Sequence, residues 1–183
     1  MEGRERLRLF VALVLPEDAR DRLAKWQEDV FPTRSGVRPV PRANLHVTLA
    51  FLGHRPSEDI PKIMEDMQAA ARAAGELVLV ARKYRETSRV GMVVLDDQGP
   101  VLKTRALAVD VQRRMQRQGV PLRERSPWIS HVTVLRFSGA SPHFAPSLPE
   151  LGAVSPSEVA LYHSRLRPSG AQYEILESFP LGG

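Results

Sequence analysis

The 183-residue sequence contains no cysteine. Disulfide bonds, cysteine-ligated metals and cysteine nucleophiles are therefore excluded. The absence suits the reducing cytoplasm, and we expect a cytoplasmic protein. Long apolar runs are also missing, because the run Leu9–Leu15 is much shorter than a membrane-spanning helix and is followed by Pro16 and Glu17. We therefore interpret that run as a strand and expect no membrane partner.

Several cofactor motifs are absent as well. The sequence has no glycine-rich phosphate loop, no dinucleotide-binding fingerprint and no His-Glu-x-x-His helix. Dependence on ATP or NAD is therefore unsupported. Four histidines, His46, His54, His131 and His143, could converge on a metal ion. No acidic residue accompanies the first or third of them at the spacing of metal ligands, so we expect neither a metal nor another cofactor.

Lysine is scarce, whereas arginine is abundant. Only four of the 26 basic residues are lysines, and the net charge is +5. Arginine presents a planar fork of donors that matches phosphate and can stack on nucleobases. A polyanionic partner such as nucleic acid would suit this surface, but a GC-rich genome would produce the same composition. The charge alone leaves both explanations open.

The length suits one domain spanning residues 1–183, or two small lobes that share a core, and the pattern of apolar residues predicts the α+β class. Strands adjoin strands without intervening helices, which indicates antiparallel pairing rather than a parallel α/β sheet. Residues 33–44 and 138–154 are expected to be loops, and residues 82–89 a charged connection. The predicted helices cover residues 16–30, 56–74 and 101–118, and the predicted strands cover residues 6–15, 45–53, 77–81, 90–95, 129–137, 157–166 and 173–181.

Two His-x-Thr motifs occur on predicted strands, one in each half of the chain. They are His46-Val47-Thr48 and His131-Val132-Thr133. Side chains at i and i+2 leave the same face of a strand, so each motif presents an imidazole beside a hydroxyl while its valine points the other way. A single motif of this kind is commonly structural. Two of them at similar places predict a twofold-related site with one histidine from each half.

Paired histidines can divide acid–base chemistry between them. One imidazole takes a proton from the attacking group, and the other gives a proton to the leaving group, each contributing typically about 10²–10⁴-fold in rate. Threonine hydroxyls beside the rings can donate hydrogen bonds to the non-bridging oxygens of a phosphate. Together these groups could break or form a phosphodiester without a metal ion.

The two motifs resemble those of the two-histidine phosphoesterase superfamily. The chain is similar, nearly from end to end, to the RNA 2′,3′-cyclic phosphodiesterases, also called 2′-5′ RNA ligases. The similarity includes Arg8–Ala12, Asn44–Gly53 and His131–Arg136, and it ends with Leu161, Ser164, Leu166, Gly170 and Tyr173. It implies a bilobal α+β fold, with two antiparallel sheets facing across a central cleft, helices outside and a pseudo-twofold duplication. It also implies metal-independent opening of a 2′,3′-cyclic phosphate to a 2′-phosphate, and a weak, ATP-independent 2′-5′ joining activity.

The resemblance implies a role for each residue of the site. His46 would be the acid that protonates the departing O3′, and His131 the base that activates water. Thr48 and Thr133 would hold phosphate oxygens, and Arg136 would bind the phosphate. Strict alternation puts Arg136 on the face opposite His131, so the strand must end or bulge between them.

Two positions differ from the family pattern. Ser130 stands where relatives often have proline, and the strand Val90–Leu95 lacks a tryptophan that some relatives carry. An aromatic residue that stacks on the base is therefore not identified. Trp128 and Phe10 are candidates, although both fit a core position.

Two other functions remain open. The same histidines could act on a small cyclic nucleotide phosphate such as ADP-ribose cyclic phosphate. Alternatively, the chain could be a basic RNA-binding module in which the histidines only contact phosphates; such a module would bind RNA in a salt-sensitive way and form no product. Nothing in the sequence suggests a dimer, and we expect a monomer.

Overall fold

The computed structural model describes residues 5–122, 127–168 and 170–182. Within these ranges it confirms an α+β chain with antiparallel strands. The elements in chain order are β1 (Arg6–Val14), α1 (Glu17–Val30), β2 (Val37–Pro39), the 3-10 turn η1 (Arg42–Asn44), β3 (His46–Pro56), the 3-10 turn η2 (Ser57–Asp59), α2 (Ile60–Ala74), β4 (Leu79–Glu86), β5 (Val90–Asp97), α3 (Lys103–Arg117), β6 (His131–Phe137), β7 (Glu158–Arg167) and β8 (Gly170–Pro180).

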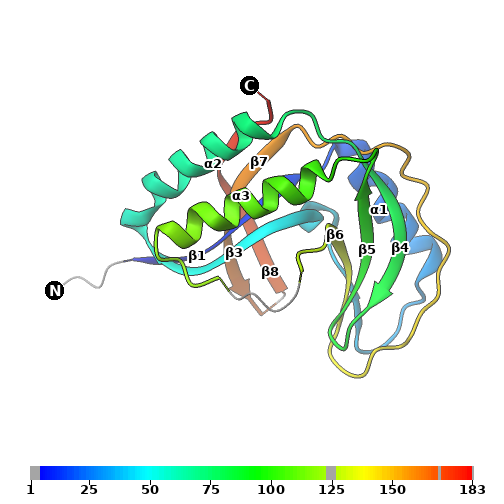
Figure 1. Cartoon of the computed structure of the whole chain (residues 1–183). Coiled ribbons are helices and arrows are strands. Elements are labelled where there is room, and N and C mark those ends of the chain that lie inside the picture. Colours follow the sequence, from blue (N-terminus) through cyan, green and yellow to red (C-terminus); the bar gives the residue numbers. More distant parts are fainter. Residues whose placement is uncertain (1–4, 123–126, 169, 183) are drawn as a thin grey trace.

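The described strands form one curled antiparallel sheet rather than the two separate sheets expected from the sequence (Figure 1). Its order is β4-β5-β6-β3-β1-β7-β8, and β2 pairs with one end of β6. The two motif strands are neighbours, because β3 and β6 pair at Val47 and Val132. Both valines are fully buried, and their pairing joins the strands of the two motifs within this one sheet. The pseudo-twofold duplication stays a prediction.

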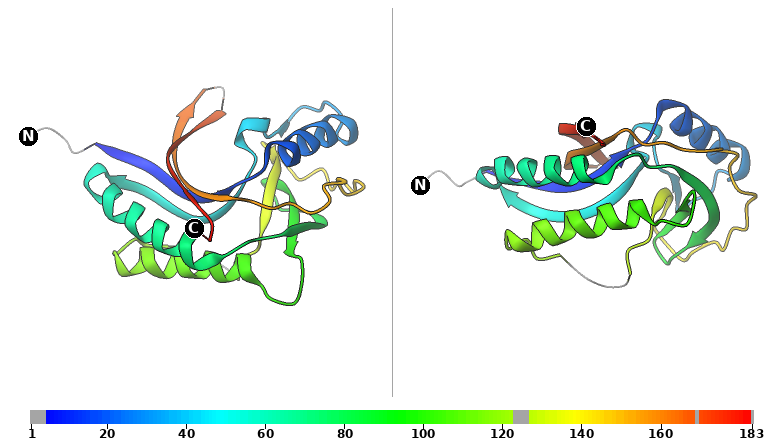
Figure 2. Two further views of the ribbon diagram at one scale, coloured as in Figure 1. Left: turned by 90° about the horizontal axis from the view of Figure 1, so that it is seen from above. Right: turned by 45° about the horizontal axis from the view of Figure 1, so that its top comes forward.

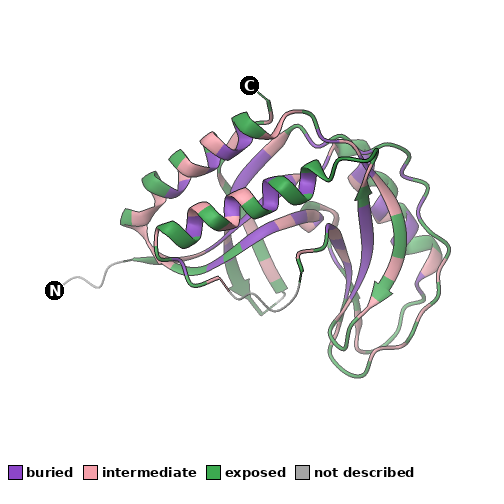
Figure 3. Ribbon diagram, viewed as in Figure 1, coloured by how far each residue is buried: buried purple, intermediate pink, exposed green. Residues whose placement is uncertain are grey.

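The helices cover the face of the sheet to which these valines point. In Figure 2, α2 and α3 run alongside one another, whereas α1 lies at the far end of the molecule, near β4 and β5. Helix α3 packs against β3, and α2 packs against β7 and β8. Leu23 of α1, Met67 of α2 and Val111 of α3 belong to the same apolar core as the two valines. Figure 3 shows this buried layer between the helices and the sheet. The opposite face is therefore the one on which polar side chains can gather.

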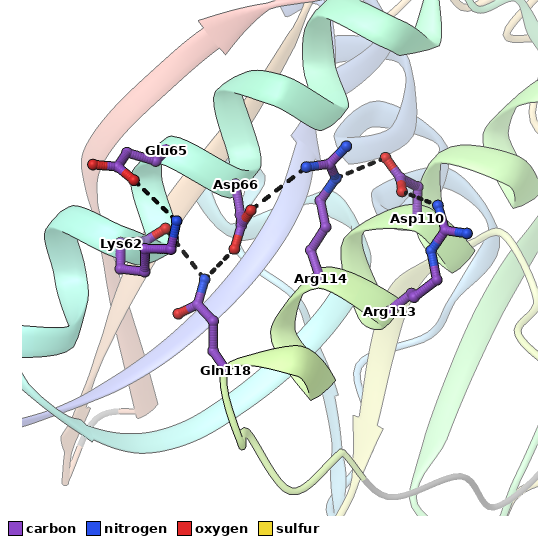
Figure 4. Close-up of polar contacts among 7 residues, drawn as sticks. All are labelled: Lys62, Glu65, Asp66, Asp110, Arg113, Arg114 and Gln118. Atoms are coloured by element: carbon purple, nitrogen blue, oxygen red, sulfur yellow. Dashed lines mark hydrogen bonds and ion pairs between the residues drawn. The ribbon is translucent and has the colours of Figure 1, made fainter.

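Polar side chains join α2 to α3 on the outside of the molecule (Figure 4). Asp66 of α2 accepts hydrogen bonds from Arg114 and from Gln118, which follows the end of α3. The Arg114 guanidinium also donates to Asp110, one turn earlier, at 2.9 Å. Such exposed or half-exposed pairs contribute little individually. They do link the helix that packs against β3, α3, to the helix that packs against β7 and β8, α2.

Two segments differ from the sequence prediction. Residues 82–86 continue β4 instead of forming a connection, and β2 lies inside the segment 33–44 that was expected to be a loop. β4 is at the edge of the sheet, where charged side chains are common because one side has no partner strand. Helix α2 ends at Gly75, whose φ of 66° is a conformation that favours glycine. Among the described residues, no helix is long and apolar enough to cross a membrane.

Candidate active site

The sheet register brings the two motifs together. Because Val47 pairs with Val132 in antiparallel strands, His46 lies across from Thr133, and Thr48 lies across from His131. All four side chains point to the face opposite the buried valines. The two histidines occupy diagonal positions on neighbouring strands, where side chains typically begin about 7–8 Å apart. The geometry thus puts two imidazoles and two hydroxyls around one small space.

Both imidazole rings are held in the same way. Nδ1 of His46 lies 2.7 Å from the carbonyl oxygen of Asn44, and Nδ1 of His131 lies 2.8 Å from that of Ile129. A carbonyl oxygen only accepts, so Nδ1 carries a proton and donates it in each ring. In the neutral ring, Nε2 is then the unprotonated nitrogen. Each histidine therefore offers Nε2 as the atom that takes up or releases a proton.

Thr48 contacts its own histidine directly. Its hydroxyl oxygen lies 2.9 Å from Nε2 of His46, and it donates to that nitrogen when the ring is neutral. The carbonyl of Thr48 accepts a hydrogen bond from the indole nitrogen of Trp128 at 3.0 Å, which ties the segment leading into β6 to β3. Trp128 is half-buried and engaged in this contact.

Arg136 reaches the histidine face because β6 contains a bulge. Thr133 pairs with Met92 of β5, whereas Leu135 pairs with the adjacent Gly91, so β6 has one extra residue between them. Beyond this bulge, Arg136 pairs with Val90, which lies on the same face of β5 as Met92. The sequence analysis required the strand to end or bulge between His131 and Arg136, and the structure shows a bulge. The positive charge of Arg136 is near enough to His46 to lower its pKa.

A buried glutamine supports the bulge. Val134, the extra residue, has its carbonyl oxygen 2.6 Å from Nε2 of Gln27, which donates a hydrogen bond to it from helix α1. The same amide nitrogen lies 3.2 Å from the carbonyl oxygen of Val40, and the backbone N–H of Val40 also donates to Val134. Gln27 is only 3% exposed. A buried polar side chain with these partners fixes the backbone from which Arg136 projects.

Aromatic rings enclose His46. The ring centroids of Phe10, Tyr162 and Tyr173 lie 4.9, 5.8 and 5.5 Å from that of His46. Burial among these rings lowers the pKa of His46 to about 4, opposed by its hydrogen bond to Asn44 and assisted by the charges of Arg136 and His131. In the free protein at neutral pH, His46 is therefore uncharged.

Two residues on this face were not identified from the sequence. Arg38 of β2 pairs directly with Arg136, and like charges in such a position favour a bound anion. Phe51 is 67% exposed, and it pairs with Phe10 of β1. A bulge in β3 between Thr48 and Ala50 moves Phe51 to the face of His46, whereas strict alternation would put it on the core face. Neither the bulges nor the short strand β2 has a sequence signal that identifies it.

The other two histidines considered as metal ligands, His54 and His143, lie away from the pair. His54 is exposed and pairs with Arg8 near the far end of β3. His143 lies in the long 138–154 loop, where its backbone N–H donates to Glu86. The described part of the chain contains no group of three or more histidine, aspartate or glutamate side chains placed to hold a metal ion.

Comparison with known proteins identifies the family. Residues 13–85 match the profile described as LigT like Phosphoesterase. The chain is 33% identical to the RNA 2′,3′-cyclic phosphodiesterase of Thermus thermophilus, over 97% of this chain and 91% of that protein. The chain belongs to this phosphoesterase family. The Escherichia coli RNA 2′,3′-cyclic phosphodiesterase is 28% identical over 95% of this chain and 96% of its own length.

Solved structures of the family share the fold. The crystal structure of TT0787 from Thermus thermophilus has a TM-score of 0.82 and 30% identity, covering 97% of this chain and 99% of that one. Escherichia coli LigT complexed with 3′-AMP has a TM-score of 0.81 and 26% identity, covering 98% and 100%. The LigT-like phosphoesterase fold therefore extends over essentially all of this chain.

Proposed function

We propose that this protein hydrolyses the 2′,3′-cyclic phosphate at RNA ends to a 2′-phosphate without a metal ion. One observation carries the proposal: the two His-x-Thr motifs of a chain in this family lie side by side on one face of the sheet, through the pairing of Val47 with Val132. Arginine, hydroxyl and imidazole groups then surround a space suited to a phosphodiester. Together they supply anion binding and proton transfer.

Each residue has a defined role in the proposed reaction. His131 Nε2 takes a proton from water, and the water oxygen forms a bond to phosphorus. The bond between phosphorus and O3′ breaks, and His46 Nε2 gives its proton to the departing O3′, which leaves a 2′-phosphate. Thr48 and Thr133 donate hydrogen bonds to the non-bridging oxygens, while Arg136 balances their negative charge.

The acid role requires His46 to gain a proton when substrate binds, because the pKa of the free ring is about 4. Two consequences of binding raise that pKa. The phosphodiester brings a negative charge near the ring, and the same charge offsets the repulsion from Arg136. Water excluded by the substrate would strengthen both effects.

Hydrolysis in the presence of EDTA tests the function. A short RNA that ends in a 2′,3′-cyclic phosphate should be converted to the 2′-phosphate at an unchanged rate. His46→Ala and His131→Ala should each abolish turnover while circular dichroism stays unchanged, and His54→Ala is the matched control that should keep activity. No turnover in EDTA, with turnover restored by added metal, would refute the proposal, as would an unchanged rate in either of the first two variants.

A substrate with sulfur in place of O3′ tests the two roles. A thiolate leaves without protonation much more readily than an alkoxide, because thiols have a pKa of only about 8.5. The thio substrate should therefore restore turnover to His46→Ala and leave His131→Ala inactive. The reverse pattern would exchange the acid and the base.

The same assays separate the alternatives raised by the sequence. A higher kcat/KM on ADP-ribose cyclic phosphate than on RNA would assign the site to small nucleotides. RNA binding that survives both histidine substitutions, with no product formed by the unaltered protein, would indicate a binding module. The joining activity, the cytoplasmic location and the monomeric state stay predictions, the last of them testable by sedimentation.

A further inference from the structure

Two cationic residues of the edge strand β4 lie across the sheet from the second motif. Across β6, β5 and β4, His131 pairs with Val94, and Val94 pairs with Lys83. One rung away, Thr133 pairs with Met92, and Met92 pairs with Arg85. Directly paired residues point to the same face of a sheet. Lys83 and Arg85 therefore project from the edge strand on the face of the active site, about two strand spacings, or ~10 Å, from β6.

An open hollow of about 450 Å³ lies over this edge. We call it the β4 hollow; its lining residues are Arg82, Lys83, Arg85, Val94, Asp96 and Ile129. Val94 is the pairing partner of His131, and the carbonyl of Ile129 holds the His131 ring. The hollow is thus next to His131, whereas the aromatic rings of β1, β7 and β8 surround His46.

The hollow carries unpaired positive charge. Arg82 forms an ion pair with Asp96 at 3.4 Å. Among the described residues, neither Lys83 nor Arg85 forms an ion pair, and both are exposed. Two such cations on one face repel each other and attract a chain of phosphates. Val94 and Ile129 add apolar surface, which suits sugars and bases between phosphates.

The proposed roles decide which strand of RNA lies there. In hydrolysis the attacking water is activated by His131, and the ribose with the departing O3′ is on the side of His46. When a 5′-hydroxyl RNA replaces water, its O5′ occupies the same position beside His131. The nucleotides that follow this O5′ then continue away from His46 and toward β4.

We propose that the β4 hollow binds the 5′-hydroxyl RNA strand that attacks the cyclic phosphate, making it the acceptor subsite for 2′-5′ joining. The inference rests on the proposed function and on the roles given to the two histidines. O5′ bonds to phosphorus, its proton goes to His131, the P–O3′ bond breaks and His46 protonates O3′. The strained ring supplies the driving force, and the step needs no ATP.

Partition between joining and hydrolysis tests the proposal. The enzyme receives an RNA ending in a 2′,3′-cyclic phosphate together with a 5′-hydroxyl RNA, and both products are quantified. In Lys83→Gln/Arg85→Gln, the ratio of joined to hydrolysed product should fall about tenfold, and the slope of log K against log salt for the acceptor should shrink by about 1.4 for two lost phosphate contacts. The matched control, Lys62→Gln/Arg113→Gln, removes the same charge from the α2–α3 layer of Figure 4 and should keep the ratio.

Three results would overturn the inference. An unchanged ratio in the β4 variant would mean that no acceptor binds there. An equal fall of joining and hydrolysis would assign the hollow to the strand that carries the cyclic phosphate. A wild-type enzyme that hydrolyses the substrate but joins no acceptor would also refute it and leave the proposed function intact. Failure of hydrolysis itself would instead contradict the proposed function.

Discussion

The aromatic enclosure of His46 should make the protein less stable in acid. Burial lowers the pKa of His46 from 6.5 to about 4. The folded protein therefore resists protonation of this ring, whereas the unfolded chain takes up the proton below about pH 6.5. A difference of about 2.5 pKa units corresponds to at most about 3 kcal/mol of stability. This contribution is fully present above about pH 6.5 and is lost as the pH falls toward 4.

Two measurements check this expectation. An NMR titration of the histidine rings, with the His46 signal assigned by its absence in His46→Gln, gives the pKa directly. Urea unfolding from about pH 4 to about pH 7 gives the stability of both proteins. Carboxylates titrate in the same range, but they do so equally in the two proteins, so the difference isolates His46. The wild-type protein should lose at most about 3 kcal/mol more than the variant between those pH values.

Ligand binding and one substitution extend the test. Inorganic phosphate bound at the site should raise the pKa of His46, because it adds negative charge beside the ring. Arg136→Gln should also raise it, because the arginine charge is one cause of its depression. A His46 pKa of 6.5 or more in the free protein would refute the reasoning, and so would parallel stability curves for wild type and His46→Gln.

Three further substitutions test how the site is built. Arg136→Ala should lower kcat/KM on the cyclic phosphate with stability changed by less than about 0.5 kcal/mol, because the side chain is exposed; unchanged kinetics would remove it from the site. Gln27→Met should reduce the unfolding free energy by about 1–3 kcal/mol, since Val134 loses a buried donor, and activity should fall with it. Gly91→Ala should destabilise because its Cβ would overlap the Tyr84 hydroxyl, and adding Tyr84→Phe should recover part of the loss in urea unfolding.

The apolar pattern of the sequence was sufficient to predict most elements of the fold. The strand Arg6–Val14 and the helix Glu17–Val30 follow the predicted positions closely, because their buried positions carry regular apolar residues. Residues 82–86 were missed for the opposite reason. They lie in an edge strand whose outward side chains are charged, so period-two apolar alternation is absent. Three of the charged residues that interrupt the apolar alternation, Arg82, Lys83 and Arg85, also line the β4 hollow.

The single sheet could not be inferred from local pattern. Which strands become neighbours depends on pairings between distant segments, here Val47 with Val132, and no periodicity encodes them. The β6 irregularity was an exception, since it follows from the spacing of two residues. On an unbroken strand, Arg136 and His131 are five positions apart and would point to opposite faces of the sheet. What the sequence could not indicate was the support for that bulge, the buried amide of Gln27 on a distant helix.

The two motifs are nearly identical in sequence, so the difference between their histidines must come from other strands. β1, β7 and β8 surround His46 with Phe10, Tyr162 and Tyr173, which lowers its pKa. β5 and β4 give His131 a valine neighbour and, beyond it, an exposed lysine. Distinct surroundings are how proteins assign different acid–base roles to like residues. In the proposed reaction, the enclosed side would receive the ribose and base of the cyclic end, and the open cationic side would receive the group that attacks.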